Sequence, residues 1–156
     1  MKSQYNIEEL ASKLMENARN KKDMIVDTSY MTAIANGDVK LHIEDKKLGI
    51  DDTYTMNNTC LNQIATKVGI SKKYLDKMRD GHNALLQDNF NYWMHKTPKQ
   101  QMIRTQGTTA RAFLSDKYKR VDNEEIAQTV LPILVNEGYE IMSSAITDSK
   151  MYIKAR

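Results

Sequence analysis

The segment Leu61–Met78, LNQIATKVGISKKYLDKM, constrains the fold more than any other part of this chain. Ala65 is small enough to let two helices cross closely. Gly69 can adopt the positive φ that ends a first helix, and Ser71 has the chemistry to cap a second one. The segment therefore predicts a helix-turn-helix corner. Its apolar residues fall where such a corner packs: Ile64, Val68, Ile70, Leu75 and Met78.

Such a corner has two interpretations, because it often presents its second helix to a DNA groove but also serves as plain scaffold. The second helix is basic, which suits phosphate contacts. Asn, Gln and Arg side chains that read base edges are scarce on it, so it favours non-specific contact over operator recognition. The basic residues concerned are Lys72, Lys73, Lys77 and Arg79.

The rest of the chain predicts an α+β fold, with a small mixed sheet around this central helical region, and a single domain over residues 1–156. A capping box of Asn6 and Glu9 begins a helix over about 7–20. Helices are also expected over about 60–68, about 72–79, around Ala84–Trp93 and over Glu124–Glu137. Strands are expected at Met24–Thr28, Val39–Ile43, Met102–Gln106, Ala110–Leu114, Tyr139–Ala145 and Met151–Ala155, whereas Asp45–Asp52 is turn-like.

In the helix over Glu124–Glu137, Pro132 is expected to cause a kink or a local defect. The apolar stripe of this helix is Ile126, Val130, Ile133 and Leu134.

Charge is unevenly distributed along the chain. The net charge is only +3, but residues 58–121 hold 12 basic and 4 acidic side chains, between two mildly acidic ends. If folding gathers these cations on one face, that face attracts polyanions. The alternative is an ordinary solvated surface of mixed charge.

Basic and aromatic residues alternate most densely near Lys96–Arg120. Cations neutralise phosphates and flat rings stack on exposed bases, so this stretch suits a single strand as well as a duplex. The alternative interpretation places Trp93 and Phe113 in the core, with the cations on the rim. The basic residues are Lys96, Lys99, Arg104, Arg111, Lys117, Lys119 and Arg120, and the neighbouring rings are Tyr92, Trp93, Phe113 and Tyr118.

Catalytic, metal and cofactor motifs are not evident. One cysteine and three scattered histidines predict no metal site, and no glycine-rich phosphate loop predicts a nucleotide cofactor. Cys60 is expected to be a buried structural residue in a reducing cytoplasm. A divalent-ion nuclease built on Asp116, Asp122 and Glu124 is an alternative, but the adjacent cations favour ion pairs or helix capping for these carboxylates.

Residues 58–156 resemble an uncharacterised family of phage- and plasmid-related proteins, known only as a domain of unknown function. The match consists of Ala65, Gly69, Ile70 and Tyr74 in the first part and Arg111, Ser115, Asp116, Tyr118, Asp122 and Asn123 in the second. The resemblance implies a mobile-element setting in a bacterial cytoplasm, without a reaction. Family members are usually longer, so the chain is alternatively the N-terminal part of a longer protein.

These observations predict a non-catalytic nucleic-acid-binding protein of a phage or mobile element, in single-strand handling or recombination, without cofactor or membrane partner. No apolar run approaches the roughly 20 residues that span a bilayer. The alternative is a protein-interaction module that inhibits a host defence factor. The expected nucleic-acid contacts are Lys72, Lys73, Lys77, Arg79, Trp93, Arg104, Arg111, Tyr118, Lys119 and Arg120, with Tyr74 as a further ring.

Overall fold

The computed structural model describes residues 5–147 and 150–156, which form an α+β fold as the sequence predicts. The chain divides into two compact units. We call residues 21–118 the sheet unit, and residues 1–20 with 119–156 the terminal unit. The expectation that residues 1–156 act as a single domain stays a prediction.

The sheet unit is built on a six-stranded mixed sheet with the strand order β1-β5-β6-β4-β3-β2. All neighbouring strands are antiparallel except β4 and β6, which run parallel. A short 3-10 helix, Thr28–Tyr30, links β1 to β2. The strands are β1 (Lys21–Asp27), β2 (Met31–Asn36), β3 (Asp38–Asp45), β4 (Ile50–Met56), β5 (Gln100–Gln106) and β6 (Thr109–Ser115).

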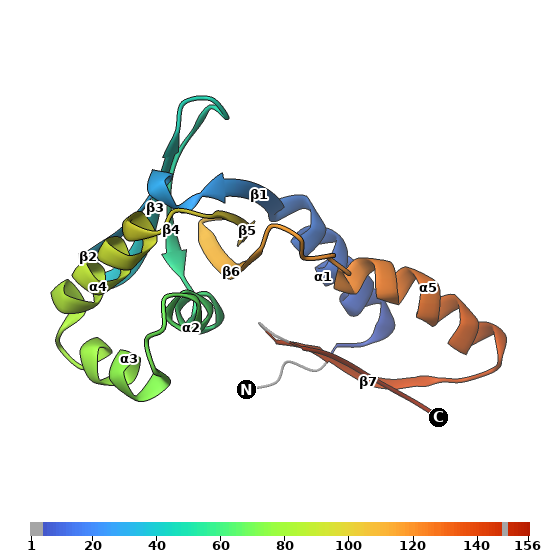
Figure 1. The fold of residues 1–156 in the computed structure, drawn as a ribbon. Coiled ribbons are helices and arrows are strands. Elements are labelled where there is room, and N and C mark those ends of the chain that lie inside the picture. Colours follow the sequence, from blue (N-terminus) through green and yellow to red (C-terminus); the bar gives the residue numbers. More distant parts are fainter. Residues whose placement is uncertain (1–4, 148–149) are drawn as a thin grey trace. The chain divides into compact units, whose positions relative to one another are not determined.

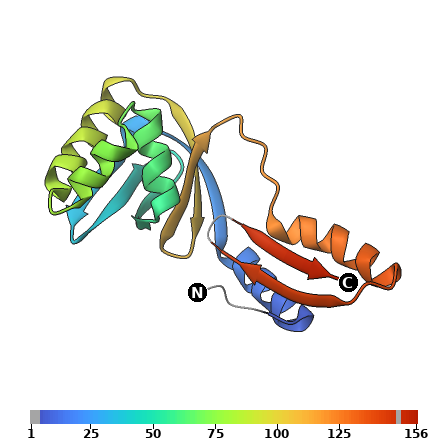
Figure 2. The same cartoon turned by 90° about the horizontal axis from the view of Figure 1, so that it is seen from below.

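Three helices cover one face of this sheet: α2 (Asn58–Lys67), α3 (Lys72–Arg79) and α4 (Asn83–Lys96). Helix α2 packs on β6 and α4 packs on β2, while α3 packs mainly on the two other helices (Figures 1 and 2). The core between the layers is fully buried, as Ile64, Phe90 and Ile103 illustrate. Alternation along β3 places Val39, Leu41 and Ile43 in this core as expected.

The helix-turn-helix corner forms as predicted. Gly69 adopts a φ of +80°, which its missing side chain allows, and the chain turns there into α3. The Ser71 hydroxyl then accepts a hydrogen bond from the Tyr74 backbone N–H at 3.2 Å. Ala65 lies buried where the helices meet. Of the five apolar residues expected to pack there, four are buried and Val68 is partly buried against them.

The sheet opens between β4 and β6. These strands pair only at Thr55–Thr109 and Met56–Ala110, because the chain leaves β4 at Asn57 and enters α2. Helix α2 then lies beside the rest of β6, where the Gln63 side-chain oxygen accepts a hydrogen bond from the Phe113 backbone N–H at 2.7 Å. An amide side chain thus takes the place of a neighbouring strand.

The other edge of the sheet, β2, is covered by a ladder of polar side chains from α4. Side chains four residues apart on the helix bond to backbone groups two residues apart on the strand. Four residues of helix rise about 6.0 Å and two residues of strand about 6.6 Å, so the two repeats nearly match. The rungs are hydrogen bonds of 2.6–2.9 Å from side chains of α4 to backbone groups of the strand and its turn. They join Asn83 to Gly37, Gln87 to Ala35, Asn91 to Ala33 and His95 to Met31.

The terminal unit pairs two helices, α1 (Ile7–Asn20) and α5 (Asn123–Asn136), with a hairpin of β7 (Ile141–Ile146) and β8 (Met151–Ala155). The predicted capping box is present, since Asn6 and Glu9 exchange side-chain to backbone hydrogen bonds of 2.8 and 3.0 Å. The unit has a small core of Leu10, Leu14 and Ala127. In Figure 1, both helices lie on the same side of the hairpin.

Two details of the sequence interpretation are wrong. Residues from Ile50 belong to strand β4 rather than to a turn, because Ile50, Tyr54 and Met56 bury one face despite the polar residues between them. The apolar stripe of α5 is largely exposed, with Ile133 at 56%, because Ala127 and Leu131 face the small core instead. Helix α5 continues through Pro132, and the expected kink or local defect there stays a prediction. Within the described residues, no helix combines the length and apolar character needed to span a membrane.

Candidate nucleic-acid interface

The outermost helix of the sheet unit, α3, carries four exposed cations, which have different partners. Lys72 forms an ion pair with Asp76 one turn later, at 3.2 Å. Arg79 donates a hydrogen bond to the Asn58 side-chain oxygen at 2.9 Å. Lys73 and Lys77 form no ion pair or hydrogen bond with any described residue. These two ammonium groups are therefore the α3 cations that can meet an anion without breaking an existing contact.

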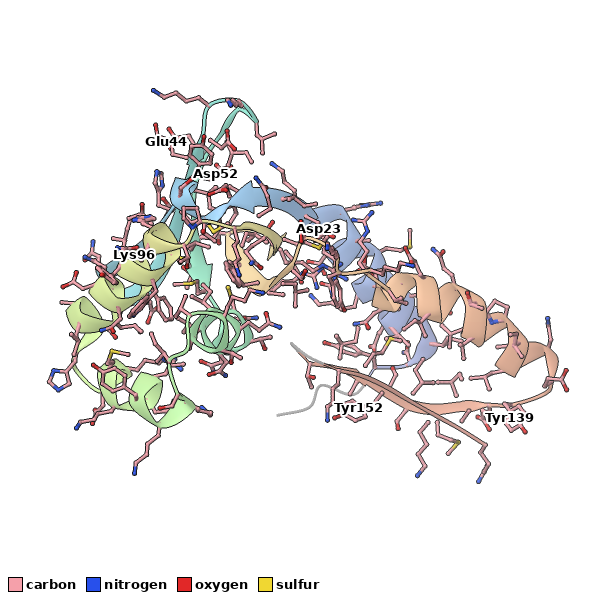
Figure 3. The ribbon with its side chains drawn as sticks, viewed as in Figure 1. Asp23, Glu44, Asp52, Lys96, Tyr139 and Tyr152 are labelled. Carbon is pink, nitrogen blue, oxygen red and sulfur yellow. The ribbon has the colours of Figure 1, made fainter. Side chains whose placement is uncertain are left out.

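The helical layer as a whole is basic. Residues 58–99 contain seven basic and three acidic side chains, whereas residues 38–52, the arm formed by β3 and β4, contain three basic and five acidic ones. Glu44 and Asp52 lie on this arm, and Lys96 lies near the end of α4 (Figure 3). Within the sheet unit, a polyanion is therefore attracted to the helices rather than to the arm.

Exposed aromatic rings accompany the cations of this layer. Trp93 is 45% exposed and lies edge-to-face with the exposed Tyr92 at 5.0 Å between ring centroids. The alternative that Trp93 is a core residue is therefore wrong, because Leu86, Phe90 and Met94 occupy the buried positions of α4. The same alternative is confirmed for Phe113, which is buried beneath α2. Tyr74 on α3 is also exposed.

Arg104 does not fit the expected nucleic-acid contact. Its side chain is 7% exposed, and its Nε lies 3.0 Å from a carboxylate oxygen of Asp23. Asp23 lies on the neighbouring strand β1 (Figure 3). A buried guanidinium held by a carboxylate cannot reach a phosphate without losing this pair. Arg111 is partly buried, with Nη2 4.0 Å from the same carboxylate oxygen. The pattern that favoured Arg104 therefore reflects an internal ion pair of the sheet, whereas the Arg111 side chain is less enclosed.

The remaining predicted contacts lie at the end of the sheet unit and beyond it. Tyr118 is 44% exposed and ends the sheet unit. Lys119 and Arg120 are exposed residues of the terminal unit. That these three residues contact nucleic acid stays a prediction.

Two hollows adjoin each other around the end of α2, and both are lined by Lys67 and Phe113. One is an open groove of about 530 Å³ between α2 and the edge of β6. The other is a smaller cavity of about 130 Å³ lined by the ends of α2 and α4 and by β5. Each has a buried amide oxygen without a hydrogen-bond partner among the described residues: Asn62 Oδ1 in the groove and Gln101 Oε1 in the cavity.

The sequence interpretation missed three of these lining residues: Lys67, Asn62 and Gln101. Lys67 precedes the basic stretch of α3, and Asn62 belongs to a helix in which amides are common. Gln101 had a usable signal, because it stands two residues before the buried Ile103 of the same strand, at a position where an apolar side chain is expected.

The side chains considered above for metal or thiol chemistry are Asp116, Asp122, Glu124 and Cys60. Within the part of the chain that the structure describes, no three His, Cys, Asp or Glu side chains are grouped to hold a metal ion. Asp116 belongs to the sheet unit, and Asp122 and Glu124 to the terminal unit. Burial raises the pKa of the Cys60 thiol to about 12, so this thiol stays protonated at neutral pH and is a poor nucleophile.

Comparison of this chain with protein-family models, curated proteins and solved structures found no match. The resemblance to the phage- and plasmid-related family therefore stays a prediction.

Proposed function

We propose that this chain binds nucleic acid through the helical layer of its sheet unit and catalyses no reaction. The observation that supports this proposal is the excess of exposed cations on α2–α4 beside three exposed rings. Lysines neutralise backbone phosphates without reading sequence, and the rings provide stacking surfaces for unpaired bases. The contacts retained are Lys72, Lys73, Lys77, Arg79 and Trp93, to which we add Lys67, Lys96 and Lys99.

Arg104 is removed from this set, because its pair with Asp23 is internal to the sheet. Arg111, Tyr118, Lys119 and Arg120 stay as proposed secondary contacts. The setting in a phage or mobile element, and a role in single-strand handling or recombination, are part of the same proposal. Their support is the family resemblance of residues 58–156.

Salt dependence tests the electrostatic part of this proposal. We expect the affinity for a fluorescein-labelled 15-nucleotide single strand, measured by anisotropy, to fall as salt rises. Each neutralised phosphate of a single strand contributes a slope of about −0.7 to log K against log salt, so four or five contacts give about −3. The double variant Lys73→Glu, Lys77→Glu should bind at least about tenfold more weakly with a slope reduced by about 1.4.

A matched control comes from the arm of the same unit. Lys46 and Lys47 are exposed lysines in the turn between β3 and β4, and Lys46→Glu, Lys47→Glu changes the net charge equally. This variant should keep most of the affinity and an unchanged salt slope. Equal losses in both variants, or an affinity insensitive to salt, would contradict the proposed interface.

A second candidate function, a protein-interaction module directed at a host factor, has its own support in the terminal unit. Helix α5 exposes Ile126, Val130 and Ile133, at 40%, 37% and 56% respectively. Exposed apolar side chains in a row on one helix are typical of a protein-binding surface. Here the proposed partner is a protein with an apolar groove, and nucleic acid plays no part.

Replacing Ile133 with lysine tests this second candidate, because the residue is exposed and its substitution leaves the small core intact. The wild-type chain, immobilised in a nuclease-treated lysate of a bacterial host, is expected to retain one stoichiometric host protein, and Ile133→Lys is expected to lose it. Lys154→Ile, an exposed change in the opposite direction on β8, should retain it. If Ile133→Lys retains the same host protein as the wild type, α5 is not the contact surface.

A further inference from the structure

The small cavity of the sheet unit has the composition of a ligand site. It occupies about 130 Å³ between the last turns of α2 and α4, with β5 beneath, which is room for several water molecules or one flat ring. Phe113 and Gln101 form buried parts of its lining. Its exposed lining residues are Trp93, Lys67, Thr97 and Lys99.

Gln101 is the buried lining residue whose side-chain oxygen lacks a hydrogen-bond partner among the described residues. It is 2% exposed, and the oxygen concerned is Oε1. Leaving such an acceptor buried and unpaired costs about 1–3 kcal/mol, so a polar group is normally found opposite it. The neighbouring Thr28 hydroxyl is fully used: it donates to the Met94 carbonyl at 2.8 Å and accepts from the Lys99 backbone N–H at 3.0 Å.

The groups around Gln101 favour a hydrogen-bond donor over an anion as the group bound inside the cavity. Both α2 and α4 end at the cavity, and a helix C-terminus carries a partial negative charge from its aligned peptide dipoles. An amide oxygen and two helix C-termini together disfavour a phosphate inside the cavity and favour an N–H group. The ammonium groups of Lys67 and Lys99 are exposed at its mouth and suit an anion placed outside it.

The ligand that satisfies these requirements is flat, carries an amine on its edge and is attached to a phosphate. An unstacked nucleobase with an exocyclic amine has all three properties. Phe113 and Trp93 offer apolar surface to the ring, and Lys67 and Lys99 lie where the backbone phosphates would follow. A base inside a duplex cannot enter, because its edge is paired and its faces are stacked.

We infer that this cavity binds one base of a single-stranded nucleic acid and that Gln101 selects a base bearing an exocyclic amine. This inference rests on the proposed nucleic-acid-binding function and adds the form and the base preference of the ligand. Cytosine and thymine are the sharpest comparison. At the same ring position cytosine carries an amine donor and thymine a carbonyl acceptor, which would face the Gln101 oxygen unfavourably.

The experiment compares the oligonucleotides dC15 and dT15, which carry the same charge. Trp93 is the only tryptophan of the chain, so its fluorescence reports on the cavity directly. We expect dC15 to quench this fluorescence and to bind about tenfold more tightly than dT15, and a 15-base-pair duplex to leave it unchanged. Gln101→Met keeps the side-chain length and removes the unpaired oxygen, so the variant should fold and lose the preference, with an unchanged salt slope.

The outcomes distinguish a failure of the proposed nucleic-acid-binding function from a failure of the proposed base selection. If neither oligonucleotide nor the duplex binds at low salt, both the proposed function and this inference are wrong. If binding is salt-dependent but dT15 binds as tightly as dC15, the base selection is wrong and the interface stands. The base selection is equally wrong if the duplex quenches Trp93 as much as dC15 does, or if Gln101→Met keeps the preference. The double variant Lys46→Glu, Lys47→Glu, on the arm and outside the cavity lining, should keep the preference for dC15.

Discussion

Replacing Asp23 with alanine is expected to lower the free energy of unfolding by about 3–5 kcal/mol, the usual loss when one partner of a buried ion pair is removed. The Asp23 and Arg104 side chains are 11% and 7% exposed, and the Arg111 guanidinium lies 4.0 Å from the same carboxylate. Without Asp23, two guanidinium groups lose their common anion inside the sheet. Urea unfolding followed by Trp93 fluorescence measures the change, because Trp93 lies in the same unit.

Two controls identify the lost charge as the cause. Asp23→Asn keeps the size and one acceptor, so it should cost less than the alanine variant. Adding Arg104→Met to Asp23→Ala also removes the buried cation, so the double variant should regain part of the lost free energy of unfolding. A loss below about 1 kcal/mol in the single variant would contradict the buried pair. The double variant should also bind a single strand normally, because Arg104 lies outside the proposed interface.

The second large effect is expected at the ladder between α4 and β2. Asn91→Ala should cost about 1–3 kcal/mol, because the Asn91 amide bonds both the N–H and the C=O of Ala33, at 2.6 and 2.9 Å. The variant leaves two backbone groups of an edge strand unpaired. Such an edge can pair with another chain, so we also expect concentration-dependent self-association in sedimentation velocity experiments.

Asn89→Ala is the matched control for this variant. Asn89 is on the same helix, but its side chain bonds to Leu85 of α4 and to the Met78 sulfur rather than to the strand. Alanine has the higher helix propensity, so this change should be close to neutral. Equal destabilisation by both substitutions would show that the ladder contributes little to stability.

Local patterns account for most of the fold that could be predicted. The corner of α2 and α3 was predictable because Gly69 and Ser71 specify its turn and cap within three residues. The capping box at Asn6 and Glu9 was equally local. Strand β4 was missed because Asp51, Asp52 and Thr53 conceal the alternation, and their neighbour β3 decides that this segment is extended.

The candidate site was harder to predict, because it depends on which side chains are buried. Arg104 and Lys99 are both cations near one strand, yet the first is enclosed with Asp23 and the second is exposed. The pairing of Arg104 with Asp23 follows from the register of β1 on β5, in which these two residues face each other, and a sequence motif does not record that register. Trp93 was ambiguous for a similar reason, since Leu86, Phe90 and Met94 already filled the inner face of its helix.

The near match of repeats between α4 and β2 also restricts how this chain can vary. Each rung accumulates an offset of about 0.6 Å, the difference between four helical residues and two strand residues, so a much longer ladder would run out of register. A single-residue insertion in the middle of α4 would rotate all later side chains by about 100° and detach the remaining rungs together. Substitutions on the outer surface of α4 leave the ladder intact, so this helix tolerates a new residue far better than a new length.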